Sequence, residues 1–125
     1  MKTTDISRIL LGLESNQLTF HDVLAFIDAH YNYQPIEFSN GEVTNTLGTN
    51  EGSAKVFSLA KQHGLNKVDT LKLFAEHYHT VQNTPQGIDH ANIRNFMRYG
   101  WAGIGMPINA LTLKNLPKPN QSPYC

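Results

Sequence analysis

An asparagine- and glycine-rich stretch at residues 33–60 constrains the fold of this chain most strongly; it reads YQPIEFSNGEVTNTLGTNEGSAKVFSLA. Within it, the dipeptide Asn40-Gly41 lies between apolar residues. Asn-Gly in that setting is a strong β-hairpin signal, because a type I′ turn requires positive φ at both central residues. We therefore predict a short hairpin, or an irregular excursion of the chain, near residues 36–44.

The second half of this stretch predicts a polar loop that leads into a helix beginning at Glu51. Loop amides, the unpaired N–H groups of the first helical turn and the helix macrodipole would together make a place for an anion or a polar ligand. The alternative is structural: Asn50 or Ser53 caps the helix, and the glycines supply turn geometry. Asparagine and glycine are common before helices, so both interpretations remain open.

Apolar residues recur with helical spacing in five segments. We expect helices at about residues 5–15, 19–31, 51–63, 69–81 and 89–100. Thr19 and Asp22 form a shortened capping box at the second helix, and Gly64 is a natural residue to end the third. Asp89 is expected to cap the last helix.

These segments predict a mainly α fold: a single compact domain of about five helices with the short hairpin. At 125 residues the chain has the length of one ordinary domain. We place that domain at residues 1–113. The proline-rich tail at residues 114–125 has little to bury, and we expect it to be mobile.

Composition excludes several classes of function. Ten basic and ten acidic residues give a net charge of zero, which argues against nucleic acid as the partner. The one cysteine, Cys125, rules out a disulfide framework or a cysteine-based metal site. No stretch has the roughly 20 apolar residues needed to cross a bilayer, and the N-terminus is not a signal peptide, so we predict a cytoplasmic protein without a membrane partner.

A metal site is a further hypothesis. Glu76 and His79 are three residues apart and share one helix face, the spacing used in carboxylate-bridged metal bundles. A second such pair is missing from the sequence, although Glu51 and the Asp89-His90 pair offer further ligands for a smaller mononuclear site. The metal candidates are therefore Glu51, Glu76, His79 and His90. The sequence does not identify a cofactor.

An ordered set of motifs runs through about residues 4–112. The motifs are Asn40-Gly41, Asn45, Gly48, Asn50-Glu51-Gly52-Ser53-x-Lys55, Tyr78, Pro85-x-Gly87-x-Asp89-His90-x-Asn92-Ile93-Arg94-x-Phe96 and Gly100-Trp101-x-Gly103-Ile104. This set resembles the HopJ family of bacterial proteins, which is named after a type III secreted effector. The resemblance implies a link to secretion and no agreed catalytic activity.

The resemblance also selects candidate ligand-binding residues. They are Asn40, Asn45, Asn50, Glu51, Lys55, Asp89, His90, Asn92 and Arg94. His79 stands where the family pattern has an arginine, which weakens it as a required ligand. The set combines carboxylates, cations and one imidazole that can transfer protons near neutral pH. The structural alternative is that Asp89 caps a helix, Arg94 pairs with Glu51 or Glu76, and the asparagines bond to turn backbone.

Two functions follow from the sequence. The first is a HopJ-like, type III effector-related protein of unknown biochemical activity that acts by binding a host or bacterial protein, after export from the bacterial cytoplasm by type III secretion. The second is a cytosolic housekeeping domain that binds a small polar ligand or a metal at the loop before Glu51. Whether the protein is an enzyme stays open in both.

Overall fold

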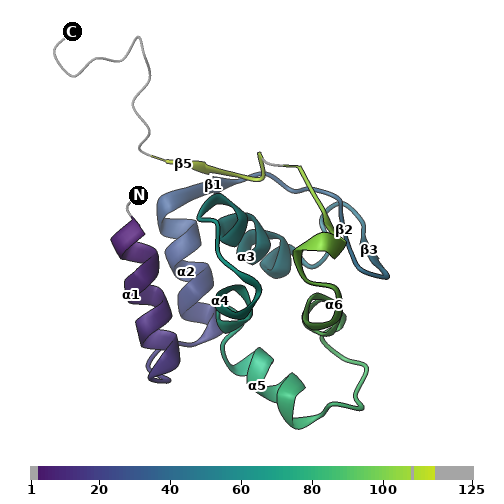
Figure 1. Ribbon diagram of the computed structural model, residues 1–125. Coiled ribbons are helices and arrows are strands. Elements are labelled where there is room, and N and C mark those ends of the chain that lie inside the picture. Colours follow the sequence, from purple (N-terminus) through teal and green to yellow (C-terminus); the bar gives the residue numbers. More distant parts are fainter. Residues whose placement is uncertain (1–2, 108, 115–125) are drawn as a thin grey trace, which may run out of the picture.

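The computed structural model describes residues 3–107 and 109–114 (Figure 1). In this part of the chain the helices are α1 (Thr3–Glu14), α2 (Phe20–His30), α3 (Glu51–Gln62), α4 (Lys67–Lys72), α5 (Glu76–Asn83), α6 (Ala91–Tyr99) and the 3₁₀-helix η1 (Gly100–Gly103). The strands are β1 (Tyr31–Tyr33), β2 (Phe38–Asn40), β3 (Val43–Asn45), β4 (Ile104–Gly105) and β5 (Leu111–Leu113). None of the helices found there is long and apolar enough to cross a membrane. The predicted tail beyond Lys114 lies outside the described residues.

Helix α3 forms the centre of the core, as its many apolar residues predict. Figure 1 shows it in the middle of the molecule. The side chain of Phe57 is fully buried, and its ring has four aromatic neighbours with centroid distances between 5.0 and 6.3 Å. These neighbours are Phe38, Phe74, Phe96 and Trp101. One side chain of α3 therefore packs against β2, the segment between α4 and α5, α6 and η1.

The predicted hairpin is confirmed, but its turn is displaced by one residue. Strands β2 and β3 pair antiparallel, with Phe38 opposite Asn45 and Asn40 opposite Val43. The two connecting residues are therefore Gly41, with φ of 59°, and Glu42. Glycine at the first position of a two-residue loop is typical of a type II′ turn. Asn40 consequently belongs to the strand, where its side chain is fully buried.

Strand pairing extends beyond the predicted hairpin. β4 pairs with the free edge of β2, and β1 pairs with β5 in a separate two-stranded sheet. After α6 the chain continues directly into η1 and then β4. The fold is therefore helical with two small antiparallel sheets, a mixed rather than a purely α arrangement.

The predicted helix at residues 69–81 is in fact two helices, so the described residues contain six α-helices instead of five. α4 begins early because the side chain of Asn66 accepts a hydrogen bond from the N–H of Asp69 at 2.8 Å. The chain then breaks at Ala75, whose φ of 52° and ψ of −124° are not helical. The capping box of Thr19 and Asp22 at α2 is confirmed.

We predict that Gly41→Ala destabilises the fold more than Gly64→Ala does. Both glycines have positive φ, 59° and 64°, which costs an alanine about 1–2 kcal/mol. A Cβ at Gly64 meets nothing within 4 Å, but at Gly41 it collides with the ring of Tyr99 and approaches Asn95 Oδ1 to 2.7 Å. Overpacking of this kind adds about 1–3 kcal/mol.

The measurement is the free energy of unfolding of both variants by chemical denaturation. The collision at Gly41 is costly because hydrogen bonds to Glu42 hold both neighbouring side chains in place. Asn95 Oδ1 accepts from the N–H of Glu42 at 2.9 Å, and the Tyr99 hydroxyl donates to the Glu42 carboxylate at 2.7 Å. Equal losses in the two variants would contradict the predicted close approach of the hairpin to α6.

Candidate functional site

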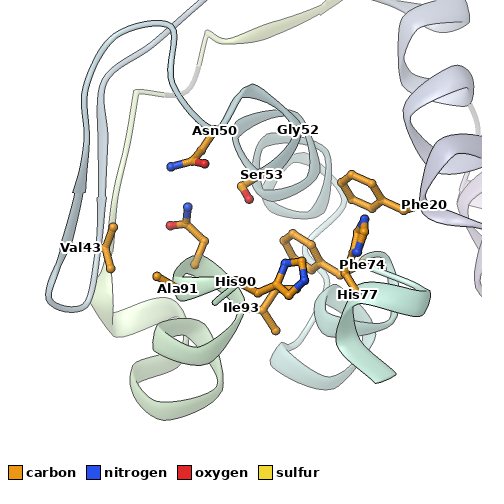
Figure 2. A pocket seen from close by; sticks show the side chains of 11 residues that line it. Phe20, Val43, Asn50, Gly52, Ser53, Phe74, His77, His90, Ala91 and Ile93 are labelled. Carbon is orange, nitrogen blue, oxygen red and sulfur yellow. The ribbon is translucent and has the colours of Figure 1, made fainter. Parts of the chain in front are cut away.

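A cleft of about 360 Å³ opens where helices α3 and α6 begin (Figure 2). It is lined by residues from α2, β3, α3, the α4–α5 segment, α5 and α6, namely Phe20, Val43, Asn50, Gly52, Ser53, Phe74, His77, His90, Ala91, Asn92 and Ile93. In Figure 2, Ser53 and His90 reach into the same space, with His77 and Phe20 along one side. This volume lies at the lower end of the range for small-molecule sites.

Two helix N-termini face this cleft. The residue before each helix, Asn50 for α3 and His90 for α6, has left-handed backbone angles and no side-chain hydrogen bond to the helix end. The expected side-chain cap at α3 is thus absent, and His90 rather than Asp89 precedes α6. The first-turn N–H groups of a helix lack intrahelical acceptors and carry partial positive charge. Gly52, Ser53 and Asn92 bring such turns to the cleft wall.

Two histidines are the ionisable side chains of the cleft wall. The rings of His77 and His90 lie 4.9 Å apart at an angle of 35°, and Phe20 places its ring edge-on to His77 at 4.9 Å. Aspartate, glutamate, lysine and arginine do not occur among the eleven lining residues. His77 was not among the site residues predicted from the sequence. The chain break at Ala75 orients α5 so that His77 faces the cleft while His79 is exposed elsewhere.

Buried asparagines hold the two helix starts and the hairpin together. Asn45 Nδ2 donates to Asn92 Oδ1 at 3.0 Å, and Asn92 Nδ2 donates to Asn45 Oδ1 at 2.9 Å. Asn50 Nδ2 donates to Asn45 Oδ1 at 2.7 Å, and Asn40 Nδ2 donates to the backbone oxygen of Asn92 at 2.8 Å. Four of the predicted site residues therefore meet, but Asn40, Asn45 and Asn92 are at most 6% exposed and mainly bind one another.

Arg94 and Asp89 form a second structural contact. Arg94 Nη2 lies 2.7 Å from Asp89 Oδ1, and Arg94 Nη1 donates to the backbone oxygen of Thr84 at 2.7 Å. Arg94 thus pairs with Asp89 and not with the glutamates considered from the sequence. The hydrogen bond from Arg94 holds the pKa of the Asp89 carboxyl below its usual value. The other Asp89 oxygen lies 4.0 Å from His90 Nε2 at the cleft.

The remaining predicted residues lie away from the cleft wall. Lys55 Nζ contacts Asp28 Oδ1 at 2.8 Å and lies 5.1 Å from the centroid of the Tyr33 ring. Glu51 is the first residue of α3 but does not line the cleft. Glu76 Oε1 accepts a hydrogen bond from the N–H of Phe20 at 2.8 Å.

The metal candidates Glu51, Glu76, His79 and His90 do not meet in one place, and Glu51 lines neither of the two cavities that hold the others. Glu76 and His79 line a separate cavity of about 350 Å³ near the α1–α2 connection, whereas His90 belongs to the cleft. Within residues 3–107 and 109–114, no three histidine, cysteine, aspartate or glutamate side chains gather in a group that would hold a metal ion.

Comparison with known proteins agrees with these motifs. The family model described as HopJ type III effector protein matches residues 7–111. The chain belongs to the HopJ type III effector family. A crystal structure described as unknown function protein VPA0580 shares 36% sequence identity with it at a TM-score of 0.80, covering 91% of this chain and 95% of that one. A search of curated proteins gave no match. Membership in the HopJ family confirms the resemblance noted in the sequence.

We predict that Asn45→Ala in this HopJ-family protein lowers the free energy of unfolding by about 2–3 kcal/mol, because it leaves the buried Nδ2 group of Asn92 without its acceptor. Chemical denaturation measures the loss. Thr44→Ala is the control in the same strand; Thr44 is exposed, and such substitutions change stability by about 0.5 kcal/mol or less. A similar loss in both variants would contradict a stabilising role for the asparagine pair.

Proposed function

We propose that this protein acts by binding a small anionic ligand in the cleft between the starts of α3 and α6. The observation that carries the proposal is the pair of His77 and His90, whose rings lie 4.9 Å apart in a cleft wall that holds no carboxylate. An imidazolium attracts an anion, and no acidic side chain lines the cleft. The nearby Asp89 carboxylate, 4.0 Å from His90 Nε2, is paired with Arg94.

The N-termini of α3 and α6 also favour a negatively charged ligand. First-turn N–H groups donate hydrogen bonds to anions, and the helix dipoles favour negative charge at these ends. Ser53 adds a hydroxyl that points into the cleft in Figure 2. The asparagine pair of Asn45 and Asn92 fixes the position of α6 relative to the hairpin, so the donors are arranged before the ligand arrives.

Family membership supports an effector-related role for this binding protein. We propose that it is exported by type III secretion and contacts a partner protein in the recipient cell.

We predict that the protein binds inorganic phosphate or an organic phosphate, and that His77→Asn and His90→Asn each weaken the affinity about tenfold, because each removes an imidazole that can carry a positive charge in the cleft. Isothermal titration calorimetry at pH 6.5 and low salt measures the affinity. His79→Asn is the matched control, since His79 lies on the same helix but outside the cleft. If His79→Asn reduced the affinity as much as His77→Asn does, the proposed site would be wrong.

We predict that residues 1–19, fused to a translocation reporter, direct the reporter through a type III secretion system. The readout is reporter activity in recipient cells. A secretion-deficient strain supplies the control, because it separates translocation from lysis. If a competent strain retains the fusion as completely as the deficient strain does, the proposed export from this N-terminus is wrong.

A further inference from the structure

We infer that the ligand of the cleft is a phosphomonoester with a small apolar substituent, and that it binds together with a proton taken up by the pair of His77 and His90. This inference rests on the proposed function and adds the chemical class of the ligand and its dependence on pH. It follows from the spacing of the two rings, from the charges around them and from the apolar part of the cleft wall.

The spacing of the rings links their protonation to an anion. With centroids 4.9 Å apart, two imidazolium rings at His77 and His90 would repel each other. A dianion beside both rings offsets this repulsion. Binding of a dianion therefore favours the doubly protonated pair, and removal of protons at higher pH weakens binding.

The charged groups near His77 and His90 do not account for the expected pH dependence of ligand affinity. Asp89 Oδ2 lies 4.0 Å from His90 Nε2, but Arg94 engages the other oxygen of that carboxylate at 2.7 Å. On α5, the Glu76 carboxylate accepts the N–H of Phe20 at 2.8 Å.

The other elements around the pair add few charges. On α3, Glu51 lies outside the cleft wall. Its charge acts on Tyr33 instead, whose pKa is raised mainly by burial and further by Glu51. From α2 and the α4–α5 segment, the wall residues are the phenylalanines Phe20 and Phe74. Among these groups the histidines are the ones that ordinarily change charge between pH 5 and 8.

The ligand class follows from the remaining donors and from the apolar wall. A phosphomonoester carries nearly two negative charges at pH 7 and offers three acceptor oxygens, which suits two imidazolium rings and two sets of first-turn amides. Phe20, Phe74, Val43 and Ile93 line the rest of the cleft. An ester with a small apolar or aromatic group fills the apolar part of the cleft, whereas free phosphate leaves that part filled with water.

The test is calorimetric titration of the full chain with phenyl phosphate from pH 5.5 to 8.5, in two buffers of different ionisation enthalpy. We expect affinity to be highest between about pH 6 and 7, because the ligand loses its second proton near pH 6 and an imidazolium attracts an anion only while it is charged. Affinity should fall at least tenfold by pH 8.5, with net proton uptake on binding near pH 7. His77→Asn and His90→Asn should flatten the fall, while His79→Asn should retain it.

Two further ligands separate the charge from the substituent. Phenyl sulfate remains a monoanion over the whole range and should bind at least tenfold more weakly than phenyl phosphate at pH 7. Inorganic phosphate should also bind more weakly, because it lacks the apolar group; equal affinity would assign the cleft to free phosphate and overturn the ester.

The outcomes distinguish this inference from the proposed function. Phenyl phosphate binding that stays constant above pH 7 with no proton uptake would overturn the inference and leave anion binding intact. Equal binding of phenyl sulfate would overturn the requirement for a dianion. If none of the three anions binds, the proposed function and the inference both fail.

Discussion

The reciprocal hydrogen bonds between the buried amides of Asn45 and Asn92 determine where the cleft forms. A buried amide costs free energy unless its donors and acceptors are paired, so each of these side chains is satisfied only when the other faces it. Asn45 also accepts a hydrogen bond from Asn50 before α3, while Asn92 belongs to the first turn of α6. The hairpin thereby brings the starts of two helices, which are far apart in the sequence, to the same cleft. The aromatic cluster around Phe57 supplies the burial on which this contact rests.

Features that depend on neighbouring residues were predicted well. The hairpin, the capping box at Thr19 and the limits of α3 arise from interactions within a few residues, and each is confirmed. The strands β1, β4 and β5 were missed because their hydrogen bonds go to distant segments, such as Tyr31 with Leu113. The break at Ala75 was missed for a related reason: alanine favours helices, and only tertiary packing of this buried residue sustains its positive φ.

In the candidate site, too, the sequence predicted some features, while others depend on tertiary contacts. The family pattern selected the asparagines and His90, which the structure brings to one place. The pattern did not distinguish residues that line the cleft from residues that support it, because Lys55 and Arg94 use their charges in ion pairs with Asp28 and Asp89. His77 was missed because its role follows from the break before α5, which the sequence did not predict. Its neighbour His90 then becomes half of a pair rather than a single imidazole.

The central claim is that an anion binds between the two helix starts, and amide chemical shifts test it most directly. Titration of the isotope-labelled protein with phosphate should move the backbone amide signals of residues 52–53 and 91–93, together with the imidazole signals of His77 and His90. These shifts should saturate along one binding curve, because all of these groups face one cleft. The amide signals of Asp28 and Lys55, which form an ion pair outside the cleft wall, should stay in place. Shifts scattered over the surface, or no saturating shift at the two helix starts, would contradict the account.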